Sequence, residues 1–332
     1  MKPLVLGLSR TRLTDAERAL FEHAAPAGYI LFQRNIETPE QLRALTAELR
    51  ALSGRERLPI LVDQEGGRVA RLRAPHWPEF PPARAFGDAF QRAPVTAIEA
   101  ARLNARALAA MLADVGITVD CLPVLDLADA DTHPIVGDRA FAGDPDTVSA
   151  LGDATLRGLA EGGVIGVVKH VPGHGRATVD SHAECPLVTA DRAALERDVR
   201  PFRKLAAAPM AMVAHIVYTA LDAERPASQS PTVVDFIRRD IGFTGLLLSD
   251  DIGMAALSGD IAARMAGVLA AGCDIALACS GDAADNERLC AAAPDMTADA
   301  IARLDRAMAS AMPAAEDDVA ALGAARDRLL AA

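Results

Sequence analysis

Residues 144–170 read DPDTVSALGDATLRGLAEGGVIGVVKH and contain the repeating unit from which we predict the fold. The pair Asp144-Pro145 predicts a helix start, because aspartate caps free backbone N–H groups and proline fits the first helical turn. The glycine pair at 162–163 ends this helix, and the apolar run Val164 to Val168 follows it. The run is apolar throughout, which is typical of a parallel strand buried on both faces.

Seven further runs of this kind occur along the chain, separated by helical patterns. They are Pro3 to Leu8, Gly28 to Phe32, Pro59 to Val62, Thr118 to Leu122, Ala211 to His215, Leu246 to Ser249 and Asp274 to Ala278. Eight such βα units predict an α/β fold, a (β/α)8 TIM barrel; a doubly wound open sheet is the alternative, in which the last strand does not pair with the first. Since no linker or break in composition divides residues 1–332, we predict a single domain, with residues 280–332 as further helices packed on the barrel.

Composition excludes several classes of protein. Of the 332 residues, 51% are hydrophobic and 24% charged, which predicts a globular protein with a large core. The net charge of −11 argues against nucleic acid or an anionic membrane surface as the main partner. Five cysteines without a CxxC pair favour the reducing cytoplasm. No stretch approaches the roughly 18 apolar residues of a membrane span, so we predict none.

Polar side chains gather after five of the predicted strands, where TIM barrels carry their active sites. In chain order, the main ones are Asp63, Arg71, Asp126, Arg139, Lys169, His170, His174, Asp180, His182, His215, Asp250 and Asp251. Taken singly, Asp126, Asp138 and Glu65 are better interpreted as helix caps or groups on the barrel rim. Together, however, the polar residues favour an active site.

Two kinds of hydrolase fit such a set of side chains. A metal ion could be held by imidazoles and a carboxylate, drawn from His170, His174, His182, His215 and Asp250. Against this interpretation, no HxH pair follows the first strand and Lys169 would repel a cation, so we predict neither a metal nor a cofactor. Carbohydrate cleavage instead needs carboxylates and groups that hydrogen-bond hydroxyls, and this interpretation is favoured. Such groups are Asp250, Asp63, Arg71, Arg139, Lys169 and His170.

Four motifs occur in the order of one known family. They are DQEGGRVARL at 63–72, GDRAF at 137–141, KHVPGHGRATVDSH at 169–182 and GFTGLLLSDD at 242–251. With them the chain resembles the β-N-acetylhexosaminidases of glycoside hydrolase family 3, of the single-domain bacterial cytoplasmic type. Departures from the family pattern are small and remove no catalytic position. They are Val171 for the usual Phe, Arg176-Ala177 where Asp-Thr is common, and Ile252-Gly253-Met254 for Leu-Ser-Met.

The resemblance implies a retaining exo-β-N-acetylglucosaminidase. Its implied substrate is a muropeptide with terminal N-acetylglucosamine, N-acetylglucosaminyl-1,6-anhydro-N-acetylmuramic acid with or without its peptide, cleaved during peptidoglycan recycling. By motif, Asp250 resembles the nucleophile, His182 the general acid/base and Asp180 its orienting partner. The residues implied to bind the sugar are Asp63, Arg71, Arg139, Lys169 and His170. We expect a monomer without a cofactor.

Elementary chemistry is consistent with these roles and leaves alternatives open. A histidine, with an ordinary pKa of about 6.5, can both give and take a proton near neutral pH. We expect only Asp250 of the pair Asp250-Asp251 to face the barrel mouth, with Asp251 on the rim and His174 bracing its loop. The loop with Asp180 and His182 is expected to bring His182 over the glycosidic oxygen only when substrate binds. Alternatives are substrate-assisted hydrolysis using Asp250 and Asp251, a metal-dependent hydrolase, or a sugar-binding protein without activity.

Overall fold

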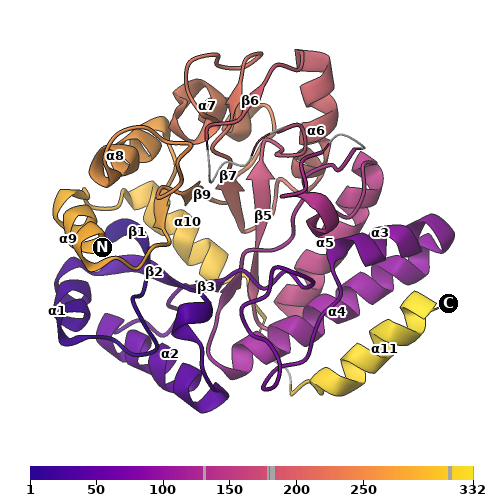
Figure 1. Cartoon of the computed structure of the whole chain (residues 1–332), viewed down its shortest axis with the longest axis horizontal. Helices are drawn as coiled ribbons and strands as arrows, with labels where there is room; N and C mark the ends of the chain where they lie inside the picture. The colour runs from indigo at the N-terminus through magenta and orange to yellow at the C-terminus, as the bar shows by residue number, and fades with distance from the viewer. Residues whose placement is uncertain (130–131, 178, 180–183, 313–315, 332) are drawn as a thin grey trace.

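The structure is a computed structural model that describes residues 1–129, 132–177, 179, 184–312 and 316–331. Within these ranges, eight parallel strands form a closed barrel in the order β1-β10-β9-β7-β5-β4-β3-β2 (Figure 1). Their bounds are β1 Lys2–Gly7, β2 Pro26–Leu31, β3 Ile60–Val62, β4 Val119–Asp120, β5 Ile165–Val171, β7 Met210–Val213, β9 Leu246–Asp251 and β10 Ile275–Ala278. Because β1 pairs with β10, Leu4 lying opposite Ala276, the sheet has no open edge. The predicted TIM barrel is therefore confirmed, and the open sheet is excluded.

Helices surround the barrel (Figure 1). They are α1 Asp15–Ala24, α2 Pro39–Ser53, α3 Ala83–Arg92, α4 Pro94–Asp114, α5 Pro145–Glu161, α6 Arg192–Lys204, α7 Pro231–Arg239, α8 Ile261–Ala271, α9 Ala283–Ala292, α10 Ala298–Met308 and α11 Val319–Ala331, with 3-10 turns η1 Gln33–Asn35, η2 Gly137–Arg139 and η3 Ala227–Gln229. Helix α5 begins as predicted, since the Asp144 carboxylate accepts the Thr147 N–H at 2.8 Å, and Gly162 caps its end. In the described ranges, no helix has both the length and the apolar character needed to cross a membrane.

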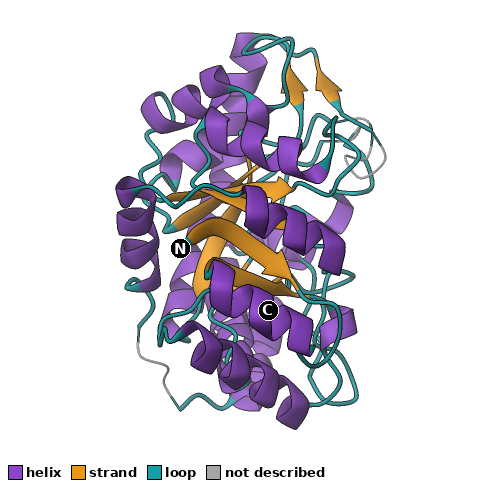
Figure 2. Ribbon diagram, turned by 90° about the vertical axis from the view of Figure 1, so that its left-hand side faces the viewer, coloured by secondary structure: helices purple, strands orange, loops and turns teal. Residues whose placement is uncertain are grey.

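Every apolar run of the sequence coincides with a barrel strand, with ends shifted by a few residues. A second, two-stranded parallel sheet was not predicted: β6 Leu187–Val188 pairs with β8 Val217–Tyr218. It stands apart from the barrel (Figure 2). Strands of two residues are too short to produce a recognisable pattern of apolar residues.

The barrel interior is an apolar core that continues into α10. Side chains from the barrel strands form one buried cluster with Met296, Ala300, Leu304, Ala307 and Met308. Helix α10 therefore covers the N-terminal end of the barrel, and Figure 1 shows it behind the strands. Helix α11 instead packs against the outer helix α4, where Arg326 donates a hydrogen bond to Asn104 at 2.9 Å. The opposite, C-terminal end of the barrel is left for the functional groups.

Candidate active site

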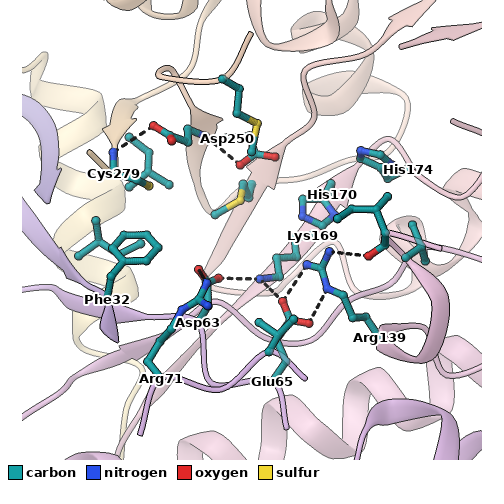
Figure 3. Close-up of a pocket in the computed structure, with 18 residues that line it drawn as sticks. Phe32, Asp63, Glu65, Arg71, Arg139, Lys169, His170, His174, Asp250 and Cys279 are labelled. Carbon is teal, nitrogen blue, oxygen red and sulfur yellow. Dashed lines mark hydrogen bonds and ion pairs between the residues drawn. The ribbon is translucent and has the colours of Figure 1, made fainter. Parts of the chain in front are cut away.

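A pocket of about 260 Å³ lies at the C-terminal ends of the barrel strands (Figure 3). Six of the predicted site residues line it: Asp63, Arg71, Arg139, Lys169, His170 and Asp250. They come from β5, β9, the loop after β3 and η2. The volume is slightly below the roughly 300–1,000 Å³ of sites for drug-sized molecules and suits one small ring. The other two predicted residues, Asp180 and His182, lie outside the described residues.

One side of the pocket is a buried array of alternating charges. The Lys169 ammonium lies 2.9 Å from an Asp63 oxygen and 2.7 Å from a Glu65 oxygen (Figure 3). Arg139 donates two hydrogen bonds of 2.8 Å to the two oxygens of Glu65. Because Lys169 is only 2% exposed, these contacts must offset a large desolvation cost.

The array keeps its members ionised. Burial alone would raise the pKa of Glu65, but Lys169 and Arg139 lower it to about 2. Burial would likewise raise the pKa of Asp63, but Lys169 and Arg71 lower it below its usual value. Burial would lower the pKa of Lys169, yet the two carboxylates raise it above its usual value. The pocket therefore presents fixed charges, which hydrogen-bond hydroxyl groups more strongly than neutral groups do.

The ionised Glu65 is expected to make stability depend on pH. Because its folded pKa lies below the ordinary value of 4.5, it stabilises the fold above about pH 4.5, and this contribution is lost as the pH falls towards about 2. Glu65→Gln should therefore lower the free energy of unfolding at pH 7 by about 3 kcal/mol and flatten its decline in acid. Urea titrations between pH 7 and 3 test this, with the exposed Glu22→Gln as control. Parallel profiles for wild type and Glu65→Gln would contradict the prediction.

The loop after β3 is shaped by Gln64, a buried side chain that does not line the pocket with the charges. Its Oε1 accepts the N–H groups of Arg71 and Leu72 at 2.7 and 3.0 Å, and its amide donates to the Leu72 carbonyl at 2.9 Å. These bonds fold the loop back so that Arg71 reaches Asp63 at 3.3 Å. The turn needs glycine at position 66, where φ is +92° and a Cβ would lie 2.4 Å from the Pro81 carbonyl oxygen.

His170 is oriented by a buried carboxylate. Asp126 Oδ2 lies 2.7 Å from His170 Nδ1, and Oδ1 accepts the backbone N–H groups of His170 and His174 at 3.1 and 2.7 Å. Burial alone would raise the pKa of Asp126, but His170 lowers it to about 2. Since an ionised carboxylate can only accept, Nδ1 of His170 carries the proton.

These contacts correct the interpretation of Glu65 and Asp126 as helix caps or rim groups. Both are buried members of the site, although each belongs to a loop whose residue types also fit capping. For Glu65 a signal was available, because it follows Asp63 by two residues and side chains at that spacing share a face of extended chain. Asp126 gave no comparable signal, since its partner His170 is 44 residues away.

Asp250 lies across the pocket from the charge array, at the end of β9 (Figure 3). Its Oδ1 accepts the Asp251 N–H at 2.8 Å. The Ser249 hydroxyl donates to the Asp250 carbonyl at 2.7 Å and accepts the Leu277 N–H of β10 at 3.1 Å. Burial would raise the pKa of Asp250, but His170 and the hydrogen bond from the Asp251 N–H lower it below its usual value. The result is an ionised carboxylate whose backbone and one oxygen are held in place.

Two residues beside Asp250 also border the pocket. Asp251 does so, but its Oδ1 accepts the N–H groups of Gly253 and Cys279, each at 3.0 Å, and thus braces the turn after β9, in keeping with the expected role on the rim. His174 lines the pocket as well, and its backbone N–H braces the loop on Asp126. Among the residues described, no three His, Cys, Asp or Glu side chains are arranged to hold a metal ion.

Comparisons with known proteins identify the family. Residues 4–311 match the Glycosyl hydrolase family 3 N terminal domain. The chain belongs to glycosyl hydrolase family 3. This family 3 enzyme is 40% identical over 309 residues to a beta-hexosaminidase of Chromobacterium violaceum, covering 92% of this chain and 86% of the relative. It is 37% identical over 308 residues to the beta-hexosaminidase of Nitrosomonas eutropha, covering 91% and 88%.

A solved structure agrees with this assignment. The family 3 enzyme superposes on NagZ from Neisseria gonorrhoeae in complex with N-trifluoroacetyl-D-glucosamine with a TM-score of 0.88. The two are 34% identical, and the match covers 99% of this chain and 97% of the other. The protein is thus a glycoside hydrolase of the beta-hexosaminidase, NagZ-like type.

Proposed function

We propose that the protein is a retaining exo-β-N-acetylglucosaminidase of peptidoglycan recycling. Its substrate is N-acetylglucosaminyl-1,6-anhydro-N-acetylmuramic acid with or without peptide, cleaved in the cytoplasm by a monomer that needs no cofactor. The observation that carries the proposal is the ionised, fixed Asp250 across a pocket the size of one ring from an array of buried charges. The N-acyl glucosamine bound by the Neisseria protein supports the choice of sugar.

The charge array would bind the terminal sugar. Its members Asp63, Arg71, Lys169 and Arg139, with His170, can give and accept hydrogen bonds to hydroxyl and acetamido groups, each worth about 1.5–3 kcal/mol where one partner is charged. Because the array is pre-formed by ion pairs, binding requires little reorganisation. The pocket of about 260 Å³ suits one ring, which fits removal of a terminal residue.

Cleavage would then proceed in two steps. Asp250 attacks the anomeric carbon as the bond to the leaving oxygen breaks, and His182, oriented by Asp180, gives that oxygen a proton. A glycosyl ester of Asp250 results. In the second step His182 takes a proton from water, the water oxygen bonds to the anomeric carbon, and the Asp250 carboxylate is released. Two displacements at one carbon retain its configuration.

Trapping the ester tests the proposal. After a pulse with a fluorinated N-acetylglucosaminyl fluoride, which slows the second step, peptide mass spectrometry should find the sugar on Asp250. Asp251→Asn should still be labelled at Asp250, and Asp250→Ala should not be labelled. Absence of an adduct together with strong inhibition by a thiazoline would instead establish substrate assistance. Turnover of nitrophenyl N-acetylglucosaminide distinguishes an enzyme from a sugar-binding protein.

Leaving-group dependence tests His182. The leaving oxygen of a natural disaccharide must be protonated, whereas nitrophenolate leaves without a proton. His182→Ala should therefore slow glycosylation by the natural disaccharide about 100-fold and by the nitrophenyl substrate far less. Release of the second product still needs a base. Stopped-flow traces with nitrophenyl substrate should therefore show a burst of nitrophenol followed by slow turnover.

Asp180→Ala is the companion variant. It leaves the imidazole but removes its orienting carboxylate, so its losses should follow the same pattern and be milder. Equal losses on both substrates without a burst would show that His182 does not transfer the proton.

A further inference from the structure

His215 is a buried titratable residue that the mechanism above leaves without a task. It follows β7 and is fully buried, and it does not line the pocket. Its ring makes two hydrogen bonds: Nδ1 lies 2.6 Å from the Ser228 hydroxyl, and Nε2 lies 3.1 Å from the Asp251 carbonyl oxygen. Asp251, which follows Asp250 in the chain, is thus contacted by a side chain from the segment after β7.

The direction of these bonds follows from their partners. A carbonyl oxygen only accepts, so Nε2 carries a proton. Burial lowers the pKa of His215, which favours the neutral ring, and Nδ1 of a neutral ring with a protonated Nε2 accepts. The Ser228 hydroxyl therefore donates to His215, which donates to Asp251.

Ser228 is itself fixed to the segment after β7 that carries the histidine. It is fully buried in η3, and its N–H donates to the Ala214 carbonyl at 3.2 Å. The neighbouring Ala227 N–H donates to the Ile216 carbonyl at 2.8 Å. The imidazole ring is consequently held at both nitrogens by groups with little freedom.

Resting on the proposed function, we propose that His215, held by Ser228, is a positioning residue for the nucleophile. It fixes the carbonyl of Asp251, and the N–H of that same residue holds Asp250 Oδ1 at 2.8 Å. The Asp251 carbonyl also accepts the Met254 N–H at 3.0 Å, which starts the turn after β9. Histidine thus sets the orientation of residue 251, and residue 251 sets the orientation of the attacking carboxylate.

Three variants test this role through the rate at which the fluorosugar labels Asp250. His215→Asn is too short to reach the Asp251 carbonyl, whereas the amide of His215→Gln can reach it. We expect His215→Asn to slow labelling and kcat by about ten- to a hundredfold, because small errors in placing reacting atoms are costly. His215→Gln should recover most of the rate. The inhibition constant of N-acetylglucosamine should change little, since the charge array is untouched.

Ser228→Ala provides a milder perturbation that leaves the ring in place. It should slow labelling several-fold by freeing the imidazole. Thr46→Val is the control for lost stability alone. Thr46 lies on α2, far from the pocket, and its buried hydroxyl donates to the Val115 carbonyl at 2.8 Å. That variant should unfold at a lower temperature, and the fluorosugar should label its Asp250 at the wild-type rate.

Several results would overturn the inference. They are wild-type labelling by folded His215→Asn, equal slowness of the Asn and Gln variants, or a loss of inhibitor affinity as large as the loss of rate. If neither His215 variant folds, unchanged labelling of Ser228→Ala overturns it. Labelling of the wild type is measured first: absence of an adduct on Asp250 refutes the proposed function, whereas an adduct with unaffected variants refutes only the role of His215.

Discussion

Asp250→Ala is expected to reduce kcat on the order of 10⁴- to 10⁶-fold, the range seen when one member of the catalytic triad of a covalent hydrolase is removed. The variant should fold, because the carboxylate is buried beside Asp251, whose pKa is raised by burial and by the Asp250 charge. Removing Asp250 thus removes a like-charge contact. Turnover of nitrophenyl N-acetylglucosaminide and thermal melting measure the two effects. Near wild-type turnover would assign the nucleophile to another residue.

Azide makes this experiment sharper. In the alanine variant a small anion can enter the space of the missing carboxylate and attack the anomeric carbon of the nitrophenyl substrate. The product should be the α-glycosyl azide, since only one displacement takes place. Asp251→Asn is the matched control, because it changes the neighbouring carboxylate that braces the turn at Gly253 and Cys279. Formation of the β-glycosyl azide by Asp250→Ala would contradict the assignment.

Lys169→Met is expected to give the second largest effect. It removes the ammonium that lies within 3 Å of both Asp63 and Glu65, and breaking a buried ion pair costs about 3–5 kcal/mol of stability. It also removes a charged donor to the sugar, worth about 1.5–3 kcal/mol of binding free energy. Urea titration gives the first quantity and the inhibition constant of N-acetylglucosamine gives the second. Wild-type values for both would place Lys169 outside the site.

A double-mutant cycle separates charge from packing. Glu65→Gln removes one of the two carboxylates that Lys169→Met leaves uncompensated, so the double variant should be more stable than the sum of the single losses predicts. The deficit of Lys169→Met should also shrink as the pH falls towards 2, because the carboxylates then become neutral in both proteins. Strict additivity at pH 7 would mean that the lysine acts only through its volume.

The amino-acid sequence predicts the strands of this fold because each is a short apolar run between helix signals. Closure of the barrel could not be predicted from the sequence, because the strands that close it, β1 and β10, lie near opposite ends of the chain. The position of α10 was also missed: its pattern predicts a helix that packs on the barrel, and only the structure shows that it covers one end.

The site was predicted to the extent that position along a strand determines it. Residues directly after strands, such as Lys169 and Asp250, converge because the carboxyl ends of parallel strands meet at one end of a barrel. Glu65 was missed although its spacing from Asp63 was a signal, because its partner Arg139 lies 74 residues away. His215 was placed at a strand end, but its partners Ser228 and Asp251 become evident only in three dimensions.

Pairing of the first strand with the last determines when this enzyme can begin to work during its own synthesis. Until β10 has left the ribosome, β1 and β9 both present unpaired edges, and such edges invite pairing with other chains. Residues of β5, β9 and the loop after β3 line the pocket. A nascent chain that has been synthesised only to residue 274 therefore contains most of the functional groups but lacks the closed barrel that aligns them. Even then the apolar interior stays open to water until α10 arrives, so barrel closure and protection from aggregation both depend on about the last sixth of the polypeptide.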